Sequence, residues 1–283
     1  MKLFNLSVFF IIILIHSSQA LEASNSSHIN TKGGIYIHEF KEYNSRPEVF
    51  SNNQKLLTIE YKDKHFLIYA IPYESDLGQN KVEIKINNNI SYLNFNIKAK
   101  TFDTQNIRVS SKYITPGLND QKRINLERNS LQEAKDIWYN QAPDLKFIIP
   151  ASGIITGRFG TKRFYNNKEG NFHNGLDIAA EIGSSIISPS KGKVILTGDY
   201  YYNGKFILLD HGKGLKSIFI HLNEILVKKG QVVNKGDLIG KIGSTGKSAG
   251  PHLHWSLMLS KTYVDPEYFL DNRIIDHFSL KVE

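Results

Sequence analysis

The chain contains no cysteine among its 283 residues. This absence excludes structural disulfides, zinc sites built from cysteine and a thiol nucleophile. It also excludes a lipid-modified cysteine behind an export signal, so we do not expect a lipoprotein. An exported protein of this composition has to obtain its stability from packing alone.

The apolar stretch at the N-terminus, in MKLFNLSVFFIIILIHSSQA, is too short to span a membrane. It runs over 13 residues, from Leu3 to Ile15, and follows the positive Lys2, with small residues near Ala20. This pattern is typical of a cleavable signal peptide. The alternative, a membrane anchor, needs roughly 20 apolar residues. We therefore expect residues 1–20 to be removed, no membrane anchor to remain and the protein to be periplasmic or secreted.

The chain also lacks a run of basic residues, although its net charge is +8. Nucleic acid is not an expected partner for an exported chain without such a run. The positive charge suits an anionic polymer as binding partner. A soluble basic surface with no specific partner accounts for the charge equally well.

Alternating apolar runs dominate residues 33–110. Examples are IYIHEF (35–40) and KVEIKI (81–86), which are rich in β-branched and aromatic residues and are separated by polar turns. Strands of this length and spacing predict a small antiparallel β-sandwich. This region contains no catalytic constellation, and we interpret it as a spacer or a folding partner.

Residues 117–145 differ in composition from the segments on both sides. NLERNSLQEAKDIWYNQ is rich in helix formers and places Leu131, Ala134, Ile137 and Trp138 on roughly one face. We predict a linker that contains one helix. It could pack on the following domain or hold the two domains apart.

Strand patterns return over residues 146–270 and are followed by a tail at 271–283. Short apolar runs such as KFILLDHG and HLHWSLML alternate with glycine-containing turns. The whole chain is therefore predicted to be all-β: a sandwich, a helical linker and an antiparallel β domain with a groove.

Two short stretches of this last domain contain several side chains that can bind a metal or transfer a proton, FHNGLD (172–177) and GPHLHW (250–255). In a strand, His252 and His254 project to the same face. A catalytic zinc usually has three protein ligands and one open position, and His173, Asp177 and His254 supply such a set. His252 and His221 are then free for acid/base work near neutral pH.

Glycines accompany both stretches. Gly175 lies between His173 and Asp177, where a side chain would crowd a compact site. The run from Gly243 to Pro251 is turn chemistry that leads directly into the strand of His252.

At these residues the chain resembles the lysostaphin/LytM-type zinc metallopeptidases of family M23, which cut bacterial peptidoglycan. The resemblance covers roughly residues 146–270. One departure is Phe219, where the family commonly has tyrosine. The segments that carry the resemblance are IITGRFG (154–160), HNGLDIAA (173–180), LDHGKG (209–214), FIHL (219–222) and KKGQVVNKGDLIGKIGSTGKSAGPHLHW (228–255).

The resemblance implies roles for five residues. His173, Asp177 and His254 would bind Zn²⁺, and His221 and His252 would be the catalytic pair, with the division of work between them left open. The N-terminal region resembles the immunoglobulin-like domain that precedes the catalytic domain in some secreted relatives.

The implied function is a secreted, zinc-dependent endopeptidase that hydrolyses peptide cross-links of peptidoglycan, with the D-alanyl–diaminopimelate bond favoured. A glycine-bridge endopeptidase is the alternative enzyme. A non-catalytic LytM-like activator of other wall hydrolases is the alternative class, but its usual mark is loss of metal ligands, and none is lost here. The N-terminal domain or the linker could also inhibit the enzyme by covering the groove.

Overall fold

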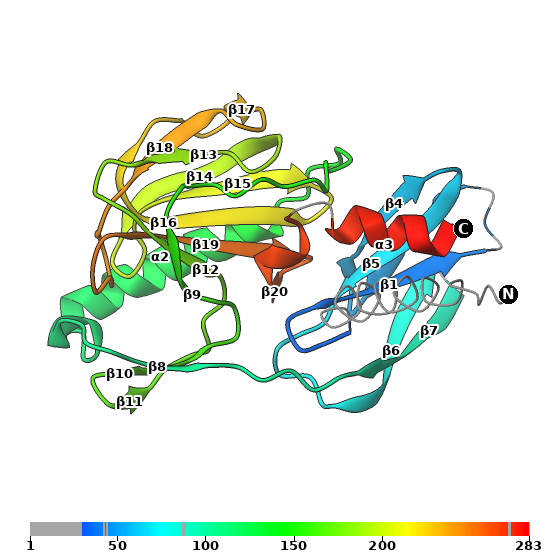
Figure 1. Cartoon of the computed structure of the whole chain (residues 1–283), viewed down its shortest axis with the longest axis horizontal. Helices are drawn as coiled ribbons and strands as arrows, with labels where there is room; N and C mark the ends of the chain where they lie inside the picture. Colours follow the sequence, from blue (N-terminus) through cyan, green and yellow to red (C-terminus); the bar gives the residue numbers. More distant parts are fainter. Residues whose placement is uncertain (1–29, 42, 44, 87–88, 271–272, 283) are drawn as a thin grey trace, which may run out of the picture.

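The computed structural model describes residues 30–282 except 42, 44, 87–88 and 271–272. The expected signal peptide, residues 1–20, lies outside the described residues. In the part that is described, no helix is both long and apolar enough to cross a membrane. Most of the regular secondary structure is strand, as predicted, and the strands build an N-terminal unit and a larger unit beside it (Figure 1).

Two antiparallel sheets form the N-terminal unit. One has the strand order β1-β5-β4 and the other β3-β2-β6-β7. The strands are β1 (Ile35–Phe40), β2 (Val49–Ser51), β3 (Gln54–Lys55), β4 (Leu57–Tyr61), β5 (Lys64–Ala70), β6 (Gly78–Ile86) and β7 (Asn89–Ile97).

Strand β5 shows how this unit joins the rest of the protein. Its residues alternate between the two faces of the sheet. Leu67 packs in the core between the two sheets, whereas Phe66 and Ile68 belong to the core that continues into the larger unit. The N-terminal unit is therefore a β-sandwich whose outer face is buried against its neighbour.

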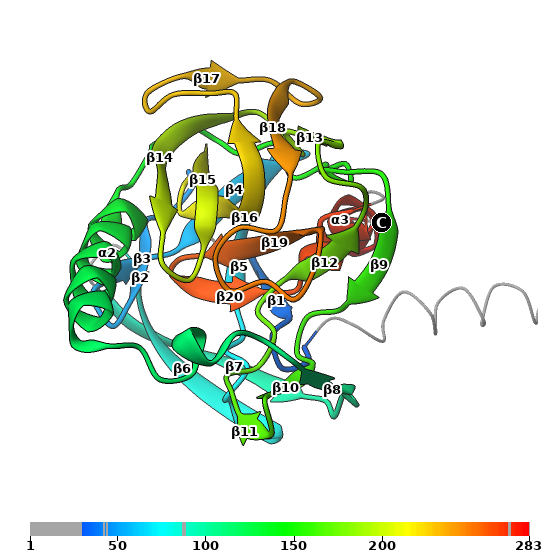
Figure 2. The same cartoon turned by 90° about the vertical axis from the view of Figure 1, so that its left-hand side faces the viewer.

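A ten-stranded sheet forms the larger unit, with the main order β17-β14-β15-β16-β19-β12-β9. Its central strands are apolar and buried, which fits the runs KFILLDHG and HLHWSLML. Figure 2 shows β14 and β12 on opposite sides of β16 and β19. The strands are β9 (Ile154–Gly157), β12 (Leu176–Ala179), β13 (Ser185–Ile187), β14 (Gly192–Tyr200), β15 (Gly204–Gly212), β16 (Leu215–Ile225), β17 (Val232–Val233), β18 (Leu238–Ile242), β19 (His252–Leu259) and β20 (Thr262–Val264).

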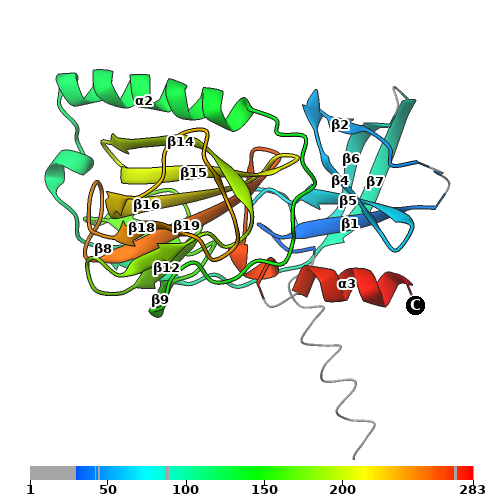
Figure 3. The same cartoon turned by 90° about the horizontal axis from the view of Figure 1, so that it is seen from above.

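Helix α2 (Leu118–Asp136) packs along this sheet near β14 (Figure 3). Leu131 and Ala134 contact a cluster of apolar side chains on β14, β15 and β16. The prediction that Ile137 and Trp138 continue the helix was wrong. The backbone becomes extended at Ile137, and its carbonyl accepts a hydrogen bond from Lys216 Nζ at 2.7 Å, so a tertiary contact ends the helix.

The segment between the two units crosses the larger one. Its strand β8 (Thr104–Ile107) pairs in parallel with β10 (Lys162–Tyr165), which also pairs with β11 (Lys168–Glu169). The expected sandwich extended to residue 110, but β8 adds to the larger unit instead. The short 3-10 helix η1 (Ser111–Tyr113) then leads into α2.

The C-terminal residues return to the N-terminal unit. The 3-10 helix η2 (Pro266–Tyr268) is followed by helix α3 (Arg273–Val282), which lies against the sheet of β1 and β5 (Figures 1 and 3). The ring of Phe278 is 5.1 Å from that of Phe66 and 5.8 Å from that of Tyr61, between centroids. The predicted tail therefore closes the shared core of both units.

Candidate metal centre and active site

Strand pairing brings the two histidine-containing stretches together. Strand β12 lies antiparallel beside β19, and Asp177 is directly opposite His254 in the register. His173 comes from the loop before β12. One ligand atom from each of these three buried residues lies within 4.8 Å of the other two.

The three inner atoms form a tight triangle. His173 Nε2 is 3.0 Å from Asp177 Oδ1 and 2.9 Å from His254 Nδ1, and the last two atoms are 2.8 Å apart. A tetrahedral ion with ligands at about 2.0–2.1 Å separates its ligands by roughly 3.3 Å. The triangle would have to open by only a few tenths of an ångström to hold such an ion.

The outer atom of each of these residues already has a partner. His173 Nδ1 donates to the carbonyl of Arg158 at 2.8 Å. His254 Nε2 donates to Ser256 Oγ at 2.7 Å, and that hydroxyl donates onward to Asn174 Oδ1 at 3.2 Å. These bonds leave His173 Nε2 and His254 Nδ1 as the unprotonated nitrogens, which is the state a metal needs.

Asp177 is held in its ionised form. Burial disfavours the charge, but the close contacts of Asp177 with His173 and His254 outweigh it and keep the pKa of Asp177 well below its usual range. Arg163 Nη2 contacts Oδ2 and so leaves Oδ1 facing the triangle. Burial lowers the pKa of His254 to about 4, which keeps that imidazole neutral near pH 7.

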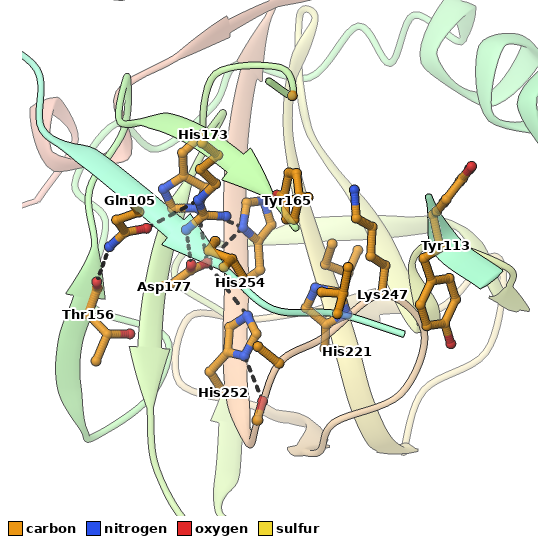
Figure 4. Close-up of a pocket in the computed structure, with 18 of the residues that line it drawn as sticks. Gln105, Tyr113, Thr156, Tyr165, His173, Asp177, His221, Lys247, His252 and His254 are labelled. Carbon is orange, nitrogen blue, oxygen red and sulfur yellow. Dashed lines mark hydrogen bonds and ion pairs between the residues drawn. The ribbon is translucent and has the colours of Figure 1, made fainter. Parts of the chain in front are cut away.

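His252 and His221 lie next to the triangle. His252 Nε2 is 3.8 Å from Asp177 Oδ1, and the centroids of the His221 and His252 rings are 4.9 Å apart. Each ring uses Nδ1 to donate to a backbone carbonyl, that of Gly250 at 2.9 Å or that of Thr245 at 2.8 Å. Both histidines therefore have Nε2 as their basic atom, and Figure 4 shows them on one side of the cavity.

A bulge in β16 turns His221 toward the site. The register between β15 and β16 shifts after Phe219, and His221 has a positive φ of 68°. Ile220 already lies opposite His254, and the bulge brings the next side chain to the same cavity. Bulges commonly redirect a side chain in this way beside active sites.

Two glycines beside the triangle, Gly175 and Gly157, allow close approach, as the sequence indicated for Gly175. A Cβ at Gly175 would lie 2.5 Å from the carbonyl oxygen of Trp255 and 2.9 Å from His254 Nε2. A Cβ at Gly157 would lie 2.7 Å from Arg163 Nη2 and 2.9 Å from Asp177 Oδ2. Both positions therefore exclude any side chain without a shift of the triangle or its supports.

Sequence reasoning missed the supporting residues. Ser256 could have been found, because residue i+2 of a strand shares the face of His254. Arg163 and Gln105 carried no such signal, because they meet only through the parallel pairing of β10 and β8. Gln105 Oε1 accepts from Arg163 Nε at 3.3 Å, and its amide donates to the carbonyl of Thr156 at 2.8 Å.

A cavity of about 1110 Å³ opens over these residues. It is lined by the five predicted site residues and, on the other side, by the crossing segment, which we define as residues 103–113. Figure 4 shows Gln105 and Tyr113 of this segment at the edge of the site. His211 is not part of it, because that side chain is buried elsewhere and bonds the Lys191 carbonyl and Ser217.

Comparison with known proteins places this site in a described family. The profile of peptidase family M23 matches residues 171–266. Two relatives from Vibrio cholerae serotype O1 are the peptidoglycan DD-endopeptidases ShyB, 41% identical over 93 residues, and ShyA, 41% identical over 87 residues. These matches cover 33% and 31% of this chain but only 22% and 20% of the two relatives, about a fifth of their length.

A solved structure is similar over most of the chain. It is the crystal structure of a Pseudomonas aeruginosa protein assigned to peptidase M23, with 31% identity and a TM-score of 0.71. The similarity covers 86% of this chain and 95% of that protein, so it includes the N-terminal unit as well as the larger sheet. Because a relative of this identity is covered almost completely, the chain belongs to peptidase family M23.

Proposed function

We propose that the protein is an exported zinc-dependent endopeptidase that hydrolyses peptide cross-links of bacterial peptidoglycan, with the D-alanyl–diaminopimelate bond as its target. The observation that carries this proposal is the triangle of His173, Asp177 and His254 beside two histidines that each bond a backbone carbonyl through Nδ1. The similarity to two peptidoglycan DD-endopeptidases supports the substrate class.

The residues of the triangle fit zinc because they offer two neutral imidazoles and one carboxylate, the ligand types of catalytic zinc sites. When bound, zinc supplies Lewis acidity that acidifies water and polarises a carbonyl. His173 Nε2, Asp177 Oδ1 and His254 Nδ1 would hold it. The outer hydrogen bonds to Arg158, Ser256 and Arg163 would keep these atoms in place.

The proton transfers fall to the remaining two histidines. His252 Nε2 would accept the proton of the attacking water and return it to the leaving amine of the cleaved peptide. The bond to Thr245 leaves His221 Nε2 as a hydrogen-bond acceptor. His221 would therefore orient the attacking water by accepting a hydrogen bond from its second O–H group. Stabilising an oxyanion would instead require His221 to carry a proton on Nε2.

Digestion of purified, cross-linked peptidoglycan tests this function. We expect the zinc-loaded protein to convert cross-linked dimers into monomers, as measured by chromatography and mass of the products. Treatment with a chelator should stop the reaction, and added zinc should restore it. Cleavage of a glycine-bridged wall alone would contradict the assigned bond, and cleavage of neither wall would contradict the function.

We also propose that the crossing segment restrains the enzyme by narrowing the groove. The side-chain amide of Asn166 makes two hydrogen bonds to the backbone of one residue in the segment. Its Oδ1 accepts from the amide of Val109 at 3.0 Å, and its Nδ2 donates to the carbonyl of Val109 at 2.8 Å. The backbone adds bonds from Lys162 to Asp103 and from Asn166 to Ile107. The segment is thus a tethered strand at the mouth of the site.

Release of this tether should raise activity on intact peptidoglycan. We expect Asn166→Gly, which removes two hydrogen bonds of about 1 kcal/mol each and tolerates the positive φ of 50° at this position, to increase kcat/KM on sacculi by up to roughly 30-fold. Asn80→Ala is the matched control, because Asn80 makes two similar amide bonds in the N-terminal unit, away from the groove. Unchanged or reduced cleavage by Asn166→Gly would identify the segment as a fixed wall of the groove.

A further inference from the structure

The cavity carries an excess of positive charge. Its described lining includes the three cations Arg108, Arg163 and Lys247 but a single acid, Asp177. Arg163 contacts that acid and is neutralised by it. Two cations therefore remain before any metal charge is counted, and a bound divalent ion would strengthen the attraction for an anionic ligand.

Lys247 is the cation that lies inside the cavity. Its side chain is half-buried, whereas Arg108 is exposed at the rim. Lys247 Nζ lies 3.4 Å from the centroid of the Tyr165 ring and 6.0 Å from that of Tyr202. Figure 4 shows Lys247 rising beside His221 toward Tyr165.

The backbone of Lys247 is fixed by the same contacts that fix His221. The amide of Lys247 donates to the carbonyl of Tyr202 at 2.8 Å. Two residues earlier, the carbonyl of Thr245 accepts a hydrogen bond from His221 Nδ1, and the Thr245 hydroxyl donates to the carbonyl of Leu222. Gly246, with a φ of 67°, permits this close approach of two loops. The backbone that carries the ammonium group is therefore held in place by hydrogen bonds.

The ammonium group has no counter-ion in the described part of the chain. Burial lowers the pKa of Lys247, Arg163 lowers it further, and no carboxylate counters these effects. A partly buried cation without an ion-pair partner is costly unless a ligand supplies the charge. The aromatic faces of Tyr165 and Tyr202 stabilise the cation only in part.

We propose that Lys247 forms a subsite for a carboxylate of the substrate peptide, next to the bond that is cut. This inference rests on the proposed function and narrows it. Diaminopimelate keeps a free carboxylate beside the cross-link, and the glutamate of the stem peptide carries another. A glycine bridge has no side-chain carboxylate, so this subsite favours carboxylate-bearing cross-links.

The test compares soluble cross-linked dimers that differ in one group. One dimer has free carboxylates, a second is amidated at diaminopimelate and a third is amidated at glutamate. The proteins are wild type, Lys247→Met, Lys247→Arg and the surface control Lys228→Met, with melting temperature and zinc content measured for each. Lys247→Met preserves length and apolar packing and removes only the charge.

We expect Lys247→Met to raise KM for the free dimer roughly 10- to 100-fold, the cost of one charge-assisted hydrogen bond, with kcat unchanged. One of the amidated dimers should be insensitive to this substitution, and that dimer identifies which carboxylate binds. Lys247→Arg should retain the preference, and Lys228→Met should match the wild type.

An equal loss on all three dimers would overturn the subsite and assign Lys247 a packing role against Tyr165. No loss on any dimer would overturn it as well. Binding of the same dimers to zinc-free protein, measured by calorimetry, separates the two proposals. Carboxylate-dependent binding without cleavage would contradict the proposed function alone, and cleavage without carboxylate preference would contradict the subsite alone.

Discussion

The His254→Ala variant should lose bound zinc and, with it, all measurable cleavage of cross-linked peptidoglycan. His254 Nδ1 is one of three atoms in the triangle, and its removal leaves two ligands that cannot enclose an ion. Substitution of a residue that only supports a ligand typically lowers the metal affinity by roughly 10- to 100-fold. We expect the loss of the ligand itself to exceed about 100-fold.

Zinc content after dialysis, together with titration by a competing chelator, measures this effect. His252→Ala is the matched control, because it removes an imidazole from the same strand two residues away without removing an atom of the triangle. Ser256→Ala should fall between the two, since it removes only the hydroxyl that accepts from His254 Nε2. Full zinc occupancy at unchanged affinity in His254→Ala would rule out its role as a ligand.

The second large effect concerns the two histidines outside the triangle. His252→Ala should retain zinc and lose roughly 10²- to 10⁴-fold in kcat, the range supplied by general acid–base catalysis. His221→Asn should retain zinc and lose less, because the orientation of the water is impaired while the base remains. Asparagine is the suitable substitution at residue 221, since it tolerates the positive φ of 68° better than alanine does.

Turnover of soluble dimers at saturating substrate, with zinc and melting temperature measured for each variant, separates these roles. Near-normal turnover in a zinc-loaded His252→Ala protein would remove His252 as the base. A larger loss in His221→Asn than in His252→Ala would reverse the assignment of the two residues. Loss of zinc in either variant would show that the residue belongs to the metal centre.

Much of the architecture could be predicted from local patterns. Two-residue alternation indicated the strands, and the composition of residues 117–145 indicated a helix, because burial of one face requires those periods. The end of α2 could not be predicted in the same way. Ile137 and Trp138 continue the apolar pattern, but the carbonyl of Ile137 accepts a hydrogen bond from Lys216 on β16, which is far away in the sequence.

The sequence by itself determined the donor chemistry of the site. The spacing of His252 and His254 puts both on one face of β19, and Gly175 gives the room between His173 and Asp177 that the triangle needs. These are properties of neighbouring residues, and backbone geometry alone carries them from sequence to structure.

Only the tertiary structure decided how those donors are supported and what surrounds them. Asp177 meets His254 through the register of β12 and β19, His221 enters through a bulge, and Gln105 reaches Arg163 through the parallel pairing of β8 and β10. The positive groove around Lys247 also joins distant segments. Strand register and loop contacts depend on the packing of the whole core, and no local pattern encodes them.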